Sequence, residues 1–186
     1  VRDNGAGFDM RYAAKLFYDE MDPDRPWDDP ASPLLVFNGL LSGTFAPTGC
    51  RSAWCGRSPL TGIWGESNMG GHWGAELRFA GYDGLMITGR ATRPALLWID
   101  GSQVALRDAS HLWGLNHYAV FDQVRAETDP KAQVACIGVA GERLVRYANV
   151  MQGGIEHART AGRTGMGAVM GSKNLKAIAV RGEERP

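Results

Sequence analysis

Two glycine-rich stretches constrain the fold of this chain more than any other feature. The first covers residues 68–75 and the second covers residues 161–168, and each follows a strand-like run and leads into a short helix-like segment. Glycine lets the backbone adopt left-handed conformations and approach a ligand closely, and free N–H groups at a helix start favour anionic oxygens. The pattern predicts two loops that together hold a large phosphorylated ligand.

The same two stretches reveal an internal repeat. Sliding the chain along itself by 93 residues places 74–75 on 167–168, 85–87 on 178–180, and the strand expected at Arg51 on one expected at Leu144. The order strand, glycine loop, helix, strand is kept in both halves. We therefore expect an α+β fold made of two related mixed β-sheet halves, with pseudo-two-fold symmetry and short helices after the glycine loops.

Hydrophobic periodicity and turn residues predict the remaining elements. Helices are expected at residues 8–21, 73–80, 116–128 and 167–173. Strands are expected at 33–38, 51–55, 85–88, 134–138, 144–151 and 175–180, and a hairpin at 95–100 and 103–107 around Asp100-Gly101.

Composition narrows the classes of partner. The chain has 186 residues, 44% of them hydrophobic, which suits one globular domain, and its formal net charge is zero. Scattered basic residues give no footprint for nucleic acid. No apolar run approaches the roughly 20 residues that span a bilayer, and residues 1–4 do not resemble a signal peptide. We expect a cytoplasmic protein without a membrane span.

Most familiar catalytic motifs are missing. The run 165–171 lacks the third glycine of a dinucleotide fingerprint, where Met170 stands, and 167–173 is one residue too short for a P-loop. Neither a serine nucleophile elbow nor a metalloprotease HExxH pair occurs. The sequence therefore supports neither a nucleotide fold nor a hydrolase.

A few single residues admit two interpretations. Cys50 and Cys55 either share a metal ion or are ordinary small apolar residues, and we assign no chemistry to them or to Cys136. His72 either approaches a ligand from the first loop or caps the following helix.

Two arginines accompany the glycine loops. Arg51 and Arg163 stand beside or within these turns, where a guanidinium can bind phosphate or the carbonyl group of a flat heterocycle through paired hydrogen bonds. The alternative is that both are surface arginines that lie over Trp54 or Trp64.

Several long runs resemble one family, the tungsten-containing aldehyde ferredoxin oxidoreductases, in their N-terminal domain. The resemblance covers nearly all of residues 1–186, which we interpret as one cofactor-binding domain. The matching runs are SGTFAPTG at 42–49, SPLTG at 58–62, SNMGG at 67–71, FAGYD at 79–83, AGR at 161–163 and GAVMGSKNLKAI at 167–178.

The resemblance implies a base for tungstopterin, in which two pterin-dithiolene groups chelate tungsten, or molybdenum in some relatives. It also implies a magnesium ion between the two pterin phosphates, near the backbone carbonyl of Asn68. Expected cofactor contacts in the first loop region are Arg51, Asn68, Met69, Gly70 and Gly71. Those in the second loop are Gly162, Arg163, Thr164, Gly165 and Gly167.

By the same resemblance, the chain is part of an enzyme that oxidises small aldehydes to carboxylic acids and passes electrons to ferredoxin or a similar acceptor. The family's opening β-hairpin is expected before this chain, and its helical domains after it. Those helical domains are expected to supply the [4Fe-4S] cluster, the acid–base groups and the substrate pocket. No catalytic residue is therefore expected here.

The sequence departs from the family at two places and leaves alternatives open. Met69 stands where relatives usually have serine, and 3–7 read Asp-Asn-Gly-Ala-Gly where they show a Gly-Gly-Arg-Gly run. A tungsten subunit of an aromatic acyl-CoA reductase and a non-catalytic pterin-binding module remain alternative functions. A homodimer also stays open, although no interface pattern is visible.

Overall fold

The structure is a computed structural model that describes residues 10–47 and 49–183, with side chains from Ala13 onward. The predicted start of the first helix, the 3–7 run and the end of the polar tail lie outside the described residues. None of the helices in the described part has the length and apolar character that a membrane crossing requires.

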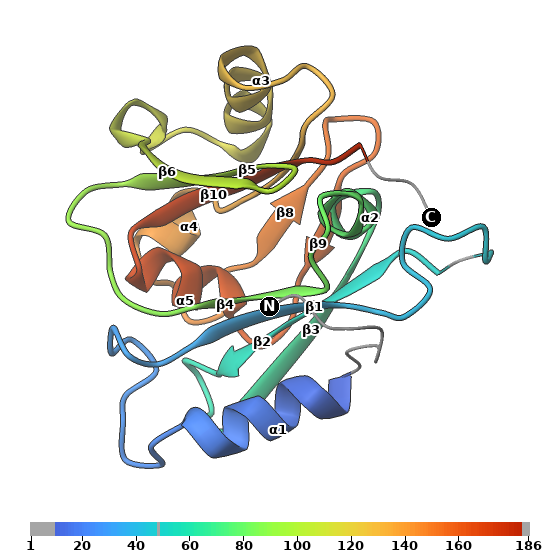
Figure 1. The fold of residues 1–186 in the computed structure, drawn as a ribbon. Coiled ribbons are helices and arrows are strands. Elements are labelled where there is room, and N and C mark those ends of the chain that lie inside the picture. Colours follow the sequence, from blue (N-terminus) through green and yellow to red (C-terminus); the bar gives the residue numbers. More distant parts are fainter. Residues whose placement is uncertain (1–9, 48, 184–186) are drawn as a thin grey trace.

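The described residues form two related halves joined by a hairpin (Figure 1). The first half contains α1 (Met10–Glu20), β1 (Leu34–Asn38), β2 (Arg51–Arg57), β3 (Trp64–Gly70), α2 (Trp73–Phe79) and β4 (Gly84–Ile87). The connection contains β5 (Ala95–Asp100), β6 (Gln103–Asp108) and the short 3₁₀ helix η1 (Ser110–Leu112). The second half contains α3 (His117–Glu127), β7 (Gln133–Cys136), α4 (Val139–Glu142), β8 (Val150–Gln152), β9 (Arg159–Ala161), α5 (Met166–Ser172) and β10 (Leu175–Arg181).

The predicted repeat is present in the topology. The first sheet has the order β3-β2-β1-β4, and the second contains β9-β8-β7-β10 in the same arrangement, with every neighbouring pair antiparallel in both. The β5–β6 hairpin extends the second sheet, with β5 parallel to β10. A shift of 93 residues places the bounds of α2 on those of α5. The expected α+β fold of two related sheets is confirmed.

Helices and sheets alternate in layers, which Figure 1 shows from α3 at the top to α1 at the bottom. The central core lies between the two sheets, where α2 contributes Trp73 and Leu77 and α5 contributes Met166 and Met170. A second cluster lies between α3 and the outer face of its sheet, and a third lies between α1 and the outer face of the other sheet. Each sheet is therefore covered on both faces over its central strands, whereas β6 at the edge of the second sheet is exposed along its whole length.

Local signals explain several element boundaries. The side chain of Asn116 accepts a hydrogen bond from the backbone N–H of Ala119 at 3.0 Å, which caps the start of α3. The β5–β6 turn contains Gly101 with φ +52°, a backbone conformation that favours glycine. The predicted helices and the hairpin appear within one or two residues of their expected bounds wherever the residues are described.

One predicted strand is wrong. Residues 144–151 were expected to be extended, but only Val150 and Met151 belong to a strand. Leu144 instead has φ +55°, and its N–H donates to Gly141 O at 3.0 Å in the turn that follows α4. The backbone of this segment therefore bonds within local turns rather than in a strand pair, and Tyr147 in it is exposed. Strands β3 and β9 and helix α4 lack counterparts among the predictions.

A buried ion pair fastens this turn region to the second sheet. Lys176 on β10 pairs with Glu142 on α4, and both side chains are almost fully buried. The ammonium also donates to Leu115 O at 3.0 Å, and the carboxylate accepts from the Gly114 N–H at 3.0 Å. Each charge thus has further hydrogen-bond partners, which a buried ion pair requires.

Candidate functional site

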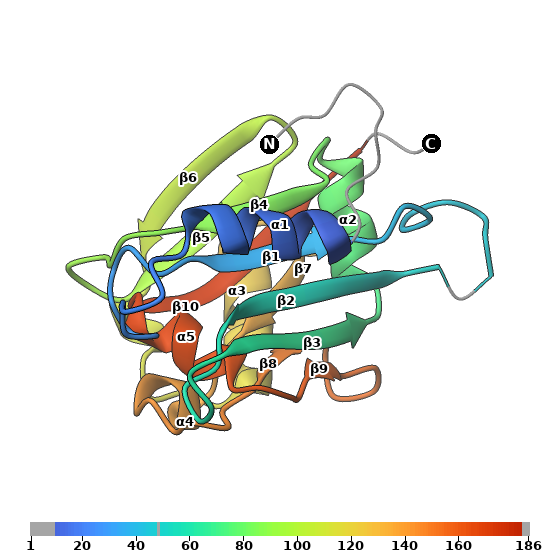
Figure 2. The same ribbon diagram turned by 90° about the horizontal axis from the view of Figure 1, so that it is seen from below.

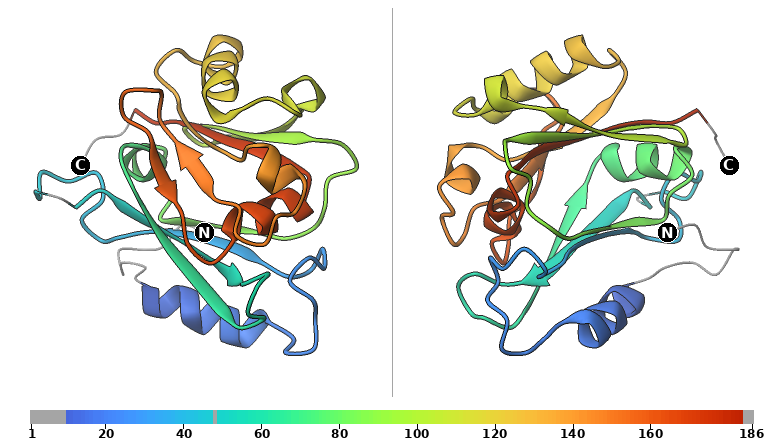
Figure 3. Two further views of the ribbon diagram at one scale, coloured as in Figure 1. Left: turned by 180° about the vertical axis from the view of Figure 1, so that it is seen from behind. Right: turned by 60° about the vertical axis from the view of Figure 1, so that its left-hand side comes forward.

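The two glycine loops meet where the edges of the two sheets lie side by side. Strand β3 runs along the edge of one sheet and β9 along the edge of the other, and the two strands are in contact (Figure 3). The backbone N–H of Arg163, just after β9, donates to Ser67 Oγ on β3 at 3.0 Å. The convergence predicted from the repeat is therefore present in the structure.

Next to this junction is a polar hollow of about 480 Å³, which we call the loop hollow. Its lining residues come from β2, β3, β9 and the second glycine loop: Arg51, Glu66, Ser67, Asn68, Thr160, Gly162 and Arg163. Arg51 and Arg163 are both exposed, so their guanidinium groups are free to meet an anion from solvent. The loop hollow can accept a charged ligand that spans both halves.

The predicted contacts divide into several groups. Arg51, Asn68, Gly162 and Arg163 line the loop hollow together. The Met69 side chain instead points into the central core, where it is 1% exposed, so its backbone alone can face a ligand. The Asn68 side chain is oriented by Glu66, because its amide N–H donates to Glu66 Oε1 at 3.1 Å.

The remaining first-loop glycines contact the other half of the repeat. Gly70 O accepts a hydrogen bond from the Gln152 amide at 3.0 Å. Gly71 has φ +93°, and a Cβ built on it would lie only 1.7 Å from Gln152 Nε2. The left-handed backbone at position 71 favours glycine, and a larger residue there would also have to displace the Gln152 amide.

Gly165 and Gly167 are buried against the turn that precedes β8. A Cβ on Gly165 would lie 2.1 Å from Arg146 O, and one on Gly167 would lie 2.3 Å from Asn149 O. Thr164 is exposed with φ +61°, an unusual conformation for a β-branched residue. Packing within the protein explains the glycines at 165 and 167, and the exposed part of this loop is 162–164.

Sequence reasoning missed Glu66, Ser67 and Thr160 in the loop hollow, and Gln152 behind it. Glu66 and Asn68, two positions apart on β3, could have indicated a polar face at this end of the strand, but the strand itself was not predicted. No sequence signal marked Gln152, because its role depends on a contact 82 positions away in the chain.

The cysteines and His72 lie in different surroundings. Burial raises the pKa of the Cys55 thiol to about 12, with a smaller effect from Glu66, and burial likewise raises that of Cys136 to about 12. Within the described residues no three His, Cys, Asp or Glu side chains lie together as metal ligands. His72 precedes α2 without a capping side-chain hydrogen bond and borders a separate hollow that includes His157.

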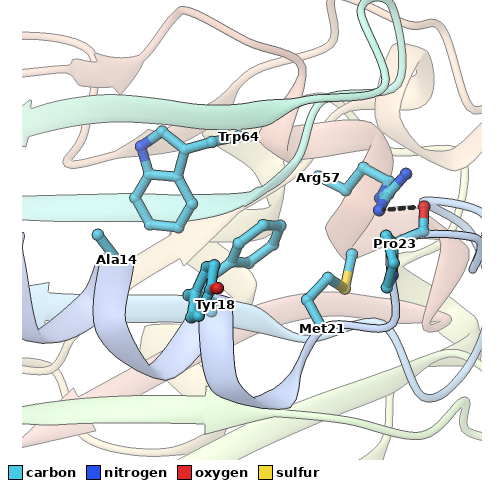
Figure 4. Close-up of a pocket in the computed structure, with 7 residues that line it drawn as sticks. Ala14, Tyr18, Met21, Pro23, Arg57 and Trp64 are labelled. Atoms are coloured by element: carbon cyan, nitrogen blue, oxygen red, sulfur yellow. Dashed lines mark hydrogen bonds between the residues drawn. The ribbon is translucent and has the colours of Figure 1, made fainter.

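A larger apolar groove of about 580 Å³ lies between α1 and the β2–β3 edge (Figure 4). Phe17, Tyr18, Met21 and Trp64 dominate its walls, and at one end the Arg57 guanidinium donates to Pro23 O at 2.8 Å. Figure 2 shows α1 lying across this face of the first sheet. The groove has one charged side chain and no acid–base pair, so it offers no catalytic group.

Fold and site together define a class of protein: a duplicated α+β domain in which two glycine-rich loops, one from each repeat, border a common hollow. The model of the family "Aldehyde ferredoxin oxidoreductase, N-terminal domain" matches residues 9–182. The chain therefore belongs to this family.

Relatives and a solved structure agree with that membership. The chain is 46% identical over 173 residues to a tungsten-containing aldehyde ferredoxin oxidoreductase of Pyrococcus furiosus, covering 92% of this chain and 28% of the relative. It is 36% identical over 162 residues to an aliphatic sulfonate oxidoreductase, WOR-like subunit, of the same organism, covering 80% of this chain and 25% of that relative.

The solved structure is the active-site complex BamBC of benzoyl coenzyme A reductase with 1,5-dienoyl-CoA. It matches with a TM-score of 0.91 and 39% identity, covering 95% of this chain and 26% of the other. The chain thus spans only about a quarter of the length of these oxidoreductases.

Proposed function

We propose that residues 1–186 form the cofactor-binding domain of a tungsten, or molybdenum, bis-pterin oxidoreductase that oxidises aldehydes to carboxylic acids. The single observation that supports this most is the meeting of two glycine loops, from two repeats, at one hollow that contains two exposed arginines. Relatives with 44–46% identity over most of this chain bear the name tungsten-containing aldehyde ferredoxin oxidoreductase.

The residues present fit a doubly phosphorylated pterin chelate. Arg51 and Arg163 supply guanidinium groups from opposite halves, which suits two phosphates better than a single anion. Gly70 and Gly162 leave their surroundings open, with no atom closer than 3.4 Å to a Cβ built on either, so a flat ligand can approach the backbone there. When bound, the metal chelate would supply two-electron redox chemistry.

The chain's own contribution is binding and orientation. Asn68, with its amide held by Glu66, presents its remaining polar atoms at the edge of the loop hollow. We propose that its backbone carbonyl also helps to bind a magnesium ion between the phosphates. The groups that exclude water and move protons at the substrate belong to the remaining domains in this proposal.

The partners follow from the same proposal. Electrons pass through a [4Fe-4S] cluster in the remaining domains to ferredoxin or a similar acceptor, the substrate is a small aldehyde, and the enzyme works in the cytoplasm. A homodimer is compatible with this scheme.

A second candidate is the tungsten subunit of an aromatic acyl-CoA reductase. The observation in its favour is the structure of the benzoyl coenzyme A reductase complex, in which one chain superposes on 95% of the length of this one. Viologen reduction separates the two. Aldehydes that donate electrons to oxidised viologen support the first candidate. Viologen reduction by a cyclic dienoyl-CoA thioester, which is the reverse of aromatic acyl-CoA reduction, without any activity on aldehydes supports the second. A loaded protein that is inactive with both would be the non-catalytic pterin-binding module.

Replacing Arg163 with alanine tests the site itself. In the natural full-length protein, purified without oxygen, we expect Arg163→Ala to lower tungsten and pterin content per chain. The free energy of unfolding should change by only about 0.5 kcal/mol, because an exposed side chain contributes little to folding. Metal analysis and denaturant unfolding measure the two quantities.

Arg143→Ala is the matched control, since Arg143 is also exposed but lies outside the loop hollow. It should keep full cofactor content. If wild-type protein that is active on aldehydes contains neither pterin nor tungsten or molybdenum, the proposed function is wrong.

A further inference from the structure

Two buried polar side chains join the halves of the repeat at the glycine loops. Ser67, from the first half, is 2% exposed and accepts the N–H of Arg163 in the second loop at 3.0 Å. Gln152, from the second half, is 1% exposed and donates its amide to Gly70 O at the first loop, also at 3.0 Å. Each half therefore holds the loop of the other.

The two held positions are equivalent in the repeat. A shift of 93 residues places Gly70 on Arg163. These are the two residues whose backbones the side chains bind: Gln152 binds the carbonyl of Gly70, and Ser67 binds the N–H of Arg163. The next residues, Gly71 and Thr164, are equivalent as well, and both have left-handed backbones with φ +93° and +61°. The hydrogen bonds thus occur at matching points, directly before the backbone turns toward its helix.

The backbone of the second loop is strained, so it needs contacts such as the Ser67 hydrogen bond to hold it. Thr164 and Gly165 are consecutive left-handed residues, with φ +61° and +79°. A β-branched residue in this conformation persists only where surrounding contacts hold it. The hydrogen bond from the preceding N–H is one such contact, and Gly65 on β3 provides another, since its missing side chain leaves room for Thr164 Cβ, 2.9 Å from where a Cβ would lie.

Both Ser67 and Gln152 are buried polar side chains. A buried hydroxyl or amide costs free energy unless it is hydrogen-bonded, and an apolar side chain would fill either position at lower cost. Ser67 also lines the loop hollow, between Glu66 and Asn68, so its hydrogen bond fixes the distance between the β3 edge and Arg163. That distance sets the spacing of the two halves of the site.

We propose that Ser67 and Gln152 are positioning residues, which hold the two loops at the spacing that the cofactor requires, each from the opposite half. The inference rests on the proposed function of the loops. It assigns these residues no contact with the reacting atoms: they act through Arg163 and Gly70 respectively.

Hydrogen–deuterium exchange in the natural full-length protein tests the contacts, with Ser67→Ala and Gln152→Met as variants. Ser67→Ala should raise the exchange rate of the Arg163 amide about fivefold, the effect of losing one ordinary hydrogen bond. Gln152→Met keeps the bulk beside Gly71 but removes the donor, and it should speed exchange across 71–74. Tungsten and pterin content should fall in both variants.

Two controls separate positioning from general packing. Ser172→Ala removes a buried hydroxyl that bonds Val169 O at 2.7 Å within α5, and Gln133→Met removes an amide on β7 that reaches Lys131 O. Ser67→Ala should not melt lower than Ser172→Ala, because both remove a buried hydroxyl. Both test variants should lose more cofactor than their controls.

The outcomes are distinct. Unchanged exchange at both loops would overturn the inference, and so would faster exchange with full cofactor content. The proposed function fails separately, if active wild-type protein contains neither pterin nor tungsten or molybdenum. Faster local exchange together with selective cofactor loss supports the positioning role.

Discussion

Gly70 and Gly165 differ in what surrounds the point where a side chain would begin. Around Gly70 no atom lies within 4 Å of that point, and its φ is not in the left-handed region. Gly165 has φ +79° and faces Arg146 O at 2.1 Å. One glycine leaves room for a ligand, and the other leaves room for the protein's own backbone.

Alanine at the two positions should therefore have opposite effects. Gly165→Ala should lower the free energy of unfolding by about 2 to 4 kcal/mol, because it combines a strained φ with an overlap that backbone atoms cannot relieve. Gly70→Ala should change it by no more than about 0.5 kcal/mol but lower cofactor content. Denaturant unfolding and metal analysis of the two variants, compared side by side, check this. Equal stability losses would contradict it.

At the scale of elements, His117 joins α3 to β7 and to the turn after β8. Its Nε2 lies 2.6 Å from Gly153 O, and its Nδ1 lies 3.0 Å from Cys136 Sγ. A neutral ring satisfies both contacts: Nε2–H donates to the carbonyl, and Nδ1 accepts from the thiol, which burial keeps protonated. Burial lowers the pKa of His117, and the nearby Lys176 charge acts in the same direction, against an opposing effect of Gly153.

This arrangement predicts acid sensitivity. Because the folded-state pKa lies below the ordinary value of 6.5, the unfolded chain binds the proton more readily. The stability contribution is complete above pH 6.5 and is lost as the pH falls toward the folded-state pKa. Denaturant unfolding between pH 5 and 7.5 (roughly the range where histidine titrates) should show this slope, and His117→Gln should reduce it. His157→Gln, at an exposed ring, is the control that should leave it unchanged.

The elements that sequence alone predicts well are those with strong periodicity or a turn residue. The helix at α3 and the β5–β6 hairpin are examples. Strand β3 was missed because Trp64–Gly70 contains no β-branched residue and ends in the glycines that were interpreted as a loop. Residues 144–149 were misassigned because their backbone N–H groups bond within turns, from Leu144 to Gly141 O and from Ala148 to Val145 O, and the residue pattern alone does not reveal these hydrogen bonds.

The candidate site was predicted only in part, because local sequence reveals its loop residues but not the contacts between distant parts of the chain. Arg51, Asn68, Gly162 and Arg163 were expected from motif and resemblance, and they line one hollow. Their shared location depends on β3 lying beside β9. The repeat indicated only that the two loops converge, because neither strand was predicted. Whether these residues bind a cofactor stays a prediction. The supporting contacts of Ser67 and Gln152 join residues 96 and 82 positions apart, and only the folded chain reveals them.

At the scale of the whole molecule, the two repeats share one core. Trp73 on α2 donates its indole N–H to Ile178 O on β10 at 3.0 Å, so the helix of one half bonds to the sheet of the other. The central cluster includes Leu34 and Trp54 from the first sheet and Ile137 and Val150 from the second. Neither half can bury its inner face alone.

Separating the halves should therefore abolish cooperative folding. The chain is exposed at Thr92 and Arg93, between β4 and β5, so a cut there leaves each repeat intact. We expect fragments 1–92 and 93–186 to show no cooperative thermal transition separately and to regain one when mixed at equal concentration. Circular dichroism during heating measures this. A sharp transition in either fragment alone would mean that its core is independent.

The hydrogen bonds from Ser67 and Gln152 cross from one repeat to the other at the two loops. A molecule that binds both loops would bind only the folded protein, in which the loops are close together. At a hundredfold excess over its dissociation constant it would raise the free energy of unfolding by about 2.7 kcal/mol. Protein that lacks such a molecule should then unfold at a lower temperature than protein that carries it.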